Sequence, residues 1–283
     1  MRKMQTLYVV GTPIGNLEDV TMRSLRVLQD VDLIAAEDTR VTRKLISHYN
    51  ISTKLTSYHR YNKVSKLPKL LSMLRDSDVA LVTDAGTPGI NDPGAELVSA
   101  AADKGIEIIS VPGPSAVTSS ISISGFQADS FTYLGFLPRK RSDRENMFGS
   151  ISTQSWPVII FEAPHRIKST LEDILGILGN RRIIVCRELS KLHEESFRGF
   201  VTEAIDYFDV PRGEFTIVLE GGSGTNSKSK NKCIQNYQEI LDLCTLMRSD
   251  GVRVKEAVSL IVDKTGISRQ KVYSMWLDSN KYT

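Results

Sequence analysis

The chain has 283 residues, of which 41% are hydrophobic, and a net charge of only +3. This length and apolar content are sufficient for two domains with full cores. No run approaches the ~18 uninterrupted apolar residues of a membrane span, and the apolar patch near the amino terminus meets Gly11 and Pro13 too early for a signal-peptide core. Three scattered cysteines, none in a CxxC pair, exclude a disulfide framework and fit a reducing compartment. We therefore expect a cytoplasmic protein.

In the first part of the chain, apolar runs that end in loops alternate with helical patterns. The runs are "TLYVVGTPIGN", "DLIAAEDTR", "VALVTDAGTPG" and "IEIISVPGPSA", and helical patterns cover residues 21–28 and 66–75. Such alternation is typical of βαβ units around a largely parallel sheet. We predict an N-terminal α/β domain over residues 1–115.

A second series of the same kind follows. Its apolar runs are "SFTYLGFLPRK", "PVIIFEAPHR", "RRIIVCREL" and "EFTIVLEGG", and a helical pattern covers residues 167–178. We predict a second α/β domain over residues 116–222, with the two domains meeting near residues 112–118.

The remaining chain is basic and divides into a linker and a helical tail. Residues 223–233 have the Gly, Ser and Lys content of a flexible linker, and ten Lys/Arg against six Asp/Glu follow from residue 228 onward. Residues 234–283 have helix-turn-helix spacing, with Gly266 as the stop and Ser268 as the cap of the second helix. Packing of two helices without any nucleic acid explains this outline equally well. The apolar positions that define it are Val254, Ala257, Val258, Ile261, Val272 and Trp276.

Three of the predicted strands end in loops of similar composition, "VVGTPIG", "LVTDAGTPG" and "SVPGPSA". In open α/β sheets, ligands bind where such carboxyl-terminal loops gather, and Gly and Pro give close and rigid backbone contact. The sequence has no GxxxxGK[ST] and no GxGxxG that opens a helix after a strand, so neither a nucleoside triphosphate nor a dinucleotide is favoured. Asp84 and Asp92 would repel a phosphate but attract a cation. Ordinary strand-to-helix connection is the alternative explanation of each loop.

Seven motifs in order carry a resemblance to a known family. They are "LYVVGTPIGNLEDVTMRSLRVL", "AAEDTR", "DAGTPGINDPG", "VPGPSA", "GFLPRK", "FEAPHR" and "RELSKLHEE". The chain resembles the tetrapyrrole-methylase superfamily and, more closely, its ribosomal RNA small subunit methyltransferase I branch. One departure is "HRYN" at residues 59–62, where the branch is expected to have "HEHN". Tyr61 cannot replace the second of those histidines as a base near neutral pH.

The resemblance implies a fold, a donor and a reaction. The fold is two α/β domains with a cleft between them and a small helical C-terminal tail, usually in a homodimer. The donor is S-adenosyl-L-methionine, whose positive charges suit acidic and carbonyl groups, and the reaction is 2′-O-methylation of a cytidine ribose in the decoding region of 16S rRNA. In the second domain, the ends of "IIFEA" and "FTIVLE" are also expected to contribute to donor binding. The donor contacts that it implies are Gly11, Thr12, Pro13, Asp84, Gly86, Thr87, Pro88, Ser115, Ala116, Phe161 and Glu162.

Methyl transfer to a ribose hydroxyl requires positioning and a proton acceptor, and it needs no metal. The four histidines are widely dispersed, and no metal-ligand cluster is evident. We predict catalytic roles for Glu37, Asp38, His165 and Lys191, and Glu162, Glu188 and His193 are further candidates for the base or its support.

Each candidate also has an ordinary structural explanation. Asp38 or Thr39 would cap the next helix, and Pro164 would start a helix with His165 and Arg166 solvated in its first turn. The segment "RELSKLHEE" mixes both signs of charge, as a salt-bridged surface does. The sequence does not decide which carboxylate or histidine is the base.

RNA binding is predicted from the basic residues. Phosphate neutralisation supplies most nonspecific affinity, and the deep major groove of an RNA helix favours contacts to shape and backbone over base readout. A solvated basic loop is the alternative for "LPRKRSDR". The predicted contacts to 16S rRNA, within the small ribosomal subunit, are Arg40, His59, Arg139, Lys140, Arg141, Arg144, Arg253, Lys255, Arg269 and Lys271.

Two other functions compete with this prediction. A tetrapyrrole or precorrin C-methyltransferase would share the fold, but its substrate would not need the basic loop and tail. A non-catalytic regulator would bind nucleic acid through the tail and sense S-adenosylmethionine, but such a sensor needs no acidic and basic residues beside the acceptor.

Overall fold

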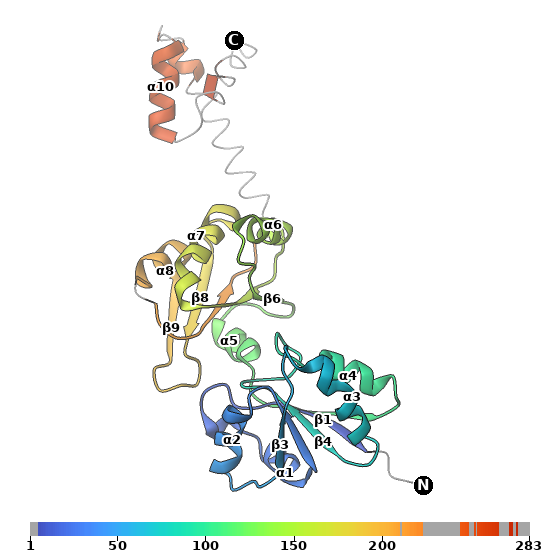
Figure 1. Ribbon diagram of the computed structural model, residues 1–283. Coiled ribbons are helices and arrows are strands. Elements are labelled where there is room, and N and C mark those ends of the chain that lie inside the picture. Colours follow the sequence, from blue (N-terminus) through green and yellow to red (C-terminus); the bar gives the residue numbers. More distant parts are fainter. Residues whose placement is uncertain are drawn as a thin grey trace. The chain divides into compact units, whose positions relative to one another are not determined.

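The structure is a computed structural model that describes residues 5–209, 211–222, 244–248, 252, 254–265, 272–273 and 276 (Figure 1). The chain forms two compact units, Met1–Gly221 and Gly222–Thr283. Within the described residues, no helix combines the length and the apolar character that a bilayer crossing demands.

The first unit contains a parallel five-stranded sheet near the amino terminus, in the order β3-β2-β4-β1-β5. Every pairing between its neighbouring strands is parallel, as the alternating pattern predicts. Parallel strands end at one edge, so their following loops gather there. The strands are β1 (Thr6–Val10), β2 (Leu33–Ala36), β3 (Lys54–Ser57), β4 (Val79–Val82) and β5 (Glu107–Val111).

Helices cover both faces of this sheet (Figure 1). The helices α1 (Met22–Asp30) and α2 (Thr39–His48) pack on one face, against alternate strand residues such as Ile34 and Val82. On the other face, α3 (Lys63–Met73) and α4 (Ala95–Ala102) pack against residues such as Leu33 and Leu81. The alternation of contacts follows the two-residue period of a strand. The short helix η1 (Leu17–Asp19) precedes α1.

The second sheet is mixed, in the order β6-β7-β10-β8-β9. β6 and β7 are parallel, whereas β10 runs antiparallel to both β7 and β8, and β9 is antiparallel to β8. The strand β9 was not predicted, because "ESFRGF" mixes charged and aromatic residues at a sheet edge and has no apolar run. The strands are β6 (Thr132–Phe136), β7 (Val158–Glu162), β8 (Arg182–Arg187), β9 (Glu195–Phe200) and β10 (Phe215–Leu219).

Helices also cover both faces of the second sheet. On one side, α6 (Arg141–Ile151), α7 (Ile167–Leu178) and α8 (Val201–Tyr207) share a core with residues such as Ile160 and Ile217. On the other, Val117 of α5 (Ala116–Ser124) packs with Ile159 and Val218. The chain therefore passes from the first sheet to the second between β5 and α5. The short helix η2 (Pro164–Arg166) leads into α7, whose bounds match the predicted helix.

The second unit contains α10 (Val254–Thr265), in agreement with the predicted first helix of the tail. Ala257, Val258 and Ile261 are buried together with Val272 and Trp276, while Val254 is exposed. The guanidinium of Arg248 lies 4.8 Å from the centre of the Trp276 ring. Gly266 and Ser268, on which the predicted turn depends, lie outside the described residues.

Candidate functional site

The three loops with similar composition touch one another through their backbones. Thr12 N–H donates to Gly86 O at 2.9 Å, and Gly86 N–H donates back to Thr12 O at 3.1 Å. A Cβ atom added to Gly11 would lie 2.8 Å from the Cα of Gly113. The loops after β1, β4 and β5 are thus held together by contacts that a side chain at either Gly11 or Gly113 would prevent.

These loops form one wall of a cavity of about 450 Å³, which we call the inner cavity. Loops and strand ends of the second sheet form the opposite wall. The described residues that line it include carboxylates and aromatic rings but no lysine, arginine or histidine. The lining consists of Ile14, Glu37, Asp84, Ala85, Gly86, Thr87, Ile90, Asn91, Asp92, Ser115, Ala116, Val117, Phe136, Phe161, Glu162, Ala163, Pro164, Leu189, Glu214, Phe215 and Thr216.

The second sheet presents strands of both directions to this cavity. Phe136 and Phe161 lie at or near the carboxyl ends of β6 and β7, whereas Phe215 and Thr216 are the first residues of β10. The predicted contribution from the end of "FTIVLE" is therefore wrong, because β10 is antiparallel to β7 and its last residues lie at the opposite edge. The antiparallel reversal was not evident from the apolar pattern.

A second, outer cavity of about 880 Å³ adjoins the first. Five residues line both, namely Glu37, Asp84, Asn91, Asp92 and Phe136. The outer cavity also receives cationic and aromatic side chains from the loops after β2 and β3. They are Arg40, His59, Arg60, Tyr61 and Lys63.

Burial raises the pKa of all three carboxyl groups at the junction of these cavities, Glu37, Asp84 and Asp92. For Glu37 the hydrogen bond from Asp84 N–H, at 3.4 Å, opposes this rise in pKa only in part. The pKa of Asp92 rises to about 6, because Asp92 is half-buried and also faces the charges of Glu37 and Asp84. Asp92 can therefore change its protonation close to neutral pH.

Asp38 caps a helix, which was the structural alternative to a catalytic role. It is the N-cap of α2, where its Oδ1 accepts from Arg40 N–H at 2.8 Å. Hydrogen bonds from the Arg40 side chain and backbone lower the pKa of Asp38 to about 2. Asp38 lines only the outer cavity, and such an acidic carboxylate is a poor proton acceptor.

Lys191 and His165 line neither cavity. Lys191 Nζ donates to Glu188 at 3.1 Å and to Glu214 at 2.9 Å. Burial acts to lower the pKa of Lys191, but these two carboxylates raise it overall, so the ammonium stays charged near neutral pH. His165 is exposed in η2, which begins with Pro164.

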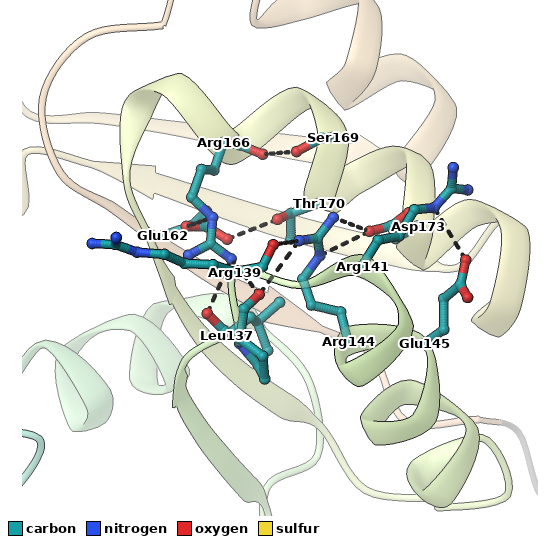
Figure 2. Close-up of polar contacts among 11 residues, drawn as sticks. Leu137, Arg139, Arg141, Arg144, Glu145, Glu162, Arg166, Ser169, Thr170 and Asp173 are labelled. Atoms are coloured by element: carbon teal, nitrogen blue, oxygen red, sulfur yellow. Dashed lines mark hydrogen bonds and ion pairs between the residues drawn. The ribbon is translucent and has the colours of Figure 1, made fainter.

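The basic loop, residues 137–144, whose last four residues form the first turn of α6, is held by two arginines that point inward (Figure 2). Arg144 is buried, donates to Asp173 at 2.6 and 2.9 Å, and also donates to Arg139 O at 2.9 Å. Arg166 donates to Leu137 O at 3.0 Å and lies 3.3 Å from Glu162. Arg144 therefore supports the loop and is not available to a phosphate.

Glu162 is a buried wall residue of the inner cavity with several partners of its own. Thr170 Oγ1 donates to it at 2.7 Å and Ala163 N–H at 2.8 Å, in addition to the ion pair with Arg166. These contacts connect the wall of the inner cavity to the basic loop (Figure 2).

The predicted donor contacts fall into two groups. Asp84, Gly86, Thr87, Ser115, Ala116, Phe161 and Glu162 line the inner cavity. Gly11, Thr12, Pro13 and Pro88 do not, and the contacts of Gly11 and Thr12 place both behind the wall as support. Sequence reasoning assigned no site role to Asn91 or Phe136, although Asn91 lies in the quoted "GINDPG" loop and Phe136 directly precedes the basic loop.

The predicted RNA contacts lie in three places. Arg40 and His59 line the outer cavity, and Arg139, Lys140 and Arg141 are exposed on the basic loop. Lys255 is exposed on α10. Arg253, Arg269 and Lys271 lie outside the described residues.

The chain is similar to known proteins over most of its length. Residues 6–205 match the family described as Tetrapyrrole (Corrin/Porphyrin) Methylases. A protein of Halalkalibacterium halodurans named ribosomal RNA small subunit methyltransferase I is 40% identical over 96% of this chain and 94% of its own. A protein of the same name from Thermotoga maritima is 47% identical over 77% of this chain and 99% of its own.

Two solved structures share the fold at low sequence identity. Diphthine synthase aligns with a TM-score of 0.62 and 12% identity, over 77% of this chain and 90% of its own. The uroporphyrin-III-C-methyltransferase of Thermus thermophilus aligns with a TM-score of 0.53 and 18% identity, over 79% of this chain and 97% of its own. With two α/β sheets and a shared cavity between their loops, the chain is a methyltransferase and belongs to the tetrapyrrole methylase family, in its ribosomal RNA small subunit methyltransferase I branch.

Proposed function

We propose that the protein uses S-adenosyl-L-methionine to methylate the 2′-hydroxyl of a cytidine ribose in the decoding region of 16S rRNA. The observation that carries the donor assignment is the inner cavity, which has carboxylates and no described cationic side chain in its lining. The rRNA substrate rests on the names of the relatives and on the cationic residues of the outer cavity.

The residues of the inner cavity fit this donor. When bound, S-adenosylmethionine would supply a methyl group that is already activated on a sulfonium. Asp84 and the carbonyl groups of the loops favour its positive charges. The amino end of α5, where Ser115 makes no side-chain cap, offers backbone N–H groups for its carboxylate. Phe136 and Phe161, whose ring centres lie 5.7 Å apart, offer apolar surface to its adenosine.

RNA would enter through the outer cavity, beside the basic loop. Arg40 and Tyr61 are exposed there, and Tyr61 is 92% exposed. An exposed ring gives an unpaired base a surface for stacking, and guanidinium groups neutralise phosphates. Arg139, Lys140 and Arg141 extend this cationic surface, whereas Arg144 does not.

The proposal also concerns assembly and location. A homodimer is part of it, by analogy with the resemblance that the motifs carry. A substrate inside the small ribosomal subunit would place the enzyme in the cytoplasm, where ribosomes are.

Transfer of a labelled methyl group tests the proposal. The protein is incubated with S-adenosylmethionine carrying a labelled methyl group and with small ribosomal subunits, naked 16S rRNA or a precorrin. We expect label in the rRNA of the subunits, and nuclease digestion should recover it as 2′-O-methylcytidine. Label in the precorrin alone would support the tetrapyrrole methylase. Tight donor binding with no label in any substrate would support the regulator.

The role of the tail has its own test. Removal of residues 223–283 should leave donor affinity intact, because all residues of the inner cavity belong to the first unit. We expect weaker use of ribosomal subunits and a smaller dependence of RNA binding on salt, since the slope of log K against log salt falls by ~0.7–0.9 for each phosphate that the protein no longer neutralises. Unchanged activity and salt dependence would exclude a role of the tail in RNA binding.

A further inference from the structure

We propose that Asp92 is the catalytic base, the group that accepts the proton of the ribose 2′-hydroxyl during methyl transfer. This inference rests on the proposed function and adds a residue that the sequence could not select.

Asp92 lies where the acceptor must meet the donor. It is one of five residues that line both the inner and the outer cavity. A base must reach the hydroxyl group at the point where the methyl group is presented, so it has to belong to the junction of the two cavities. Candidates that line only one cavity, or neither, do not meet this requirement.

Among the five residues of the junction, Asp92 is the carboxylate that makes no structural hydrogen bond. The carboxylate of Asp84 accepts from Asp38 N–H at 2.9 Å, and that of Glu37 accepts from Asp84 N–H at 3.4 Å. Asn91 donates to the hydroxyl of Tyr133, and Phe136 has no titratable group. Within the described residues, Asp92 has no hydrogen bond or ion pair that would compete with a substrate hydroxyl.

The loop around Asp92 is fixed by its neighbour. Asn91 has a left-handed backbone, with φ of 65°, and its side chain bonds to Tyr133 of β6. A Cβ atom at Gly135 would lie 2.5 Å from the Asn91 side chain, so the glycine in β6 leaves room for this contact. The second sheet thereby holds in place the loop of the first sheet that carries Asp92.

Burial and the charged groups around Asp92 together set its titration. Burial, with a further contribution from Glu37, after β2, and Asp84, after β4, raises its pKa to about 6. On β6, Tyr133 has a pKa of about 12 and is therefore neutral. Arg40, His59, Lys63 and Glu96 line the outer cavity beyond it. A base with a pKa near 6 is ionised at neutral pH and still binds a proton well.

The proton transfer balances with the methyl transfer. As the O–H bond of the ribose breaks, the proton goes to the Asp92 carboxylate. The electron pair left on the 2′-oxygen forms the bond to the methyl carbon, and the pair of the methyl–sulfur bond stays on the sulfur. The carboxyl group then returns its proton to water.

The test compares Asp92→Asn with the wild type in single-turnover methylation of small ribosomal subunits at saturating S-adenosylmethionine. We expect the rate to fall ~10²–10⁴-fold, while calorimetry shows an unchanged affinity for the donor. Asp103→Asn is the matched control, because Asp103 is exposed at the end of α4 and lines neither cavity. Glu37→Gln, the competing candidate, should lose less activity than Asp92→Asn.

Two pH measurements separate a base from a merely structural residue. The wild-type rate should rise with pH up to about 6 and then level off, and the residual rate of Asp92→Asn should lack this step. In the protein without donor, carboxyl ¹³C NMR should show a titration near pH 6 that disappears in Asp92→Asn. Asp92→Glu should recover part of the rate, because it restores a carboxylate in a shifted position.

Distinct outcomes would overturn the two proposals. A wild type that transfers no methyl group to ribosomal RNA would overturn the proposed function. A wild type that does so, together with an Asp92→Asn variant of similar rate, would overturn only the role of Asp92. Parallel loss of donor affinity in Asp92→Asn would also overturn it, since Asp92 would then be a donor contact.

Discussion

The two sheets of the first unit reach the inner cavity by different routes. In the parallel sheet, the loops after β1, β4 and β5 meet at one edge and join through backbone contacts at Gly11, Thr12 and Gly86. In the mixed sheet, the cavity receives the ends of β6 and β7 and the beginning of β10. The first wall depends on the absence of side chains, whereas the second depends on aromatic rings and on buried charges.

This difference suggests a division of roles. The glycine and proline loops leave backbone exposed to a small ligand, so the parallel sheet suits the binding of the donor. On the side of the mixed sheet, the buried Arg144 and the half-buried Arg166 donate to carbonyl groups of the basic loop, so this side suits the presentation of cations to a larger partner. Variants that damage one wall at a time can separate these roles.

The largest effect is expected from Asp173→Asn, in the second sheet's helical layer. Asp173 and Arg144 are both buried, and removal of one charge leaves the other without compensation. We expect the free energy of unfolding, measured by urea denaturation, to fall by roughly 3–5 kcal/mol. Trypsin should also cleave after Arg139, Lys140 or Arg141 faster than in the wild type, because Arg144, which donates to the loop carbonyls, loses the charge that holds it in place.

The control for this variant is Glu145→Gln. Glu145 pairs with Arg141 at 3.1 Å on the exposed side of α6, so its loss should cost no more than about 1 kcal/mol. Equal stabilities for the two variants would contradict the idea that buried charge holds the basic loop.

The sequence predicted the parallel sheet better than the mixed one, for a physical reason. Buried parallel strands are apolar on both faces, as "VALV" of β4 is, and their loops must lie at one edge. β9 pairs at the edge and is only partly buried, and the direction of β10 depends on tertiary pairing that no local pattern encodes. The wrong end of β10 was therefore assigned to the site.

Individual site residues were harder to predict than the loops. The Gly and Pro content indicated the loops, and the resemblance implied Gly86 and Ser115 within them as donor contacts; both residues line the inner cavity. The inward direction of Arg144 and the unpartnered state of Asp92 depend on side chains from other elements. The local sequence is the same whether such a charged residue is paired inside the fold or is free to contact a ligand.

Gly11→Ala should damage the first wall. The new Cβ atom would lie 2.8 Å from the Cα of Gly113, which is backbone and cannot rotate away. We expect a loss of roughly 1–3 kcal/mol in stability, the usual cost of overpacking, together with weaker binding of S-adenosylmethionine in calorimetry.

Gly176→Ala is the matched control for this substitution. Gly176 is exposed in α7 with no atom within 4 Å of an added Cβ, so alanine should stabilise the protein by about 0.5–1 kcal/mol. If Gly11→Ala bound the donor normally, the backbone contact between the loops would not be needed for the cavity.

The smallest effect concerns the junction of the two walls and has the opposite sign. Because the pKa of Asp92 is about 6 in the folded protein and 3.8 is its ordinary value, ionisation of this carboxyl group opposes folding. The cost is complete above pH 6 and disappears as the pH falls below 3.8. Because Asp92 is partly exposed and solvent weakens the effect, Asp92→Asn should stabilise the protein by roughly 1 kcal/mol at pH 7.5 and by nothing at pH 3.5.

Urea denaturation at the two pH values measures this difference in stability. Asp38→Asn, which removes a carboxylate whose pKa is lowered, should destabilise the protein at pH 7.5 instead. A stabilising Asp92→Asn that is also inactive would mean that this carboxylate is kept at the junction at the expense of stability, whereas a destabilising one would mean that it supports the contact between the walls.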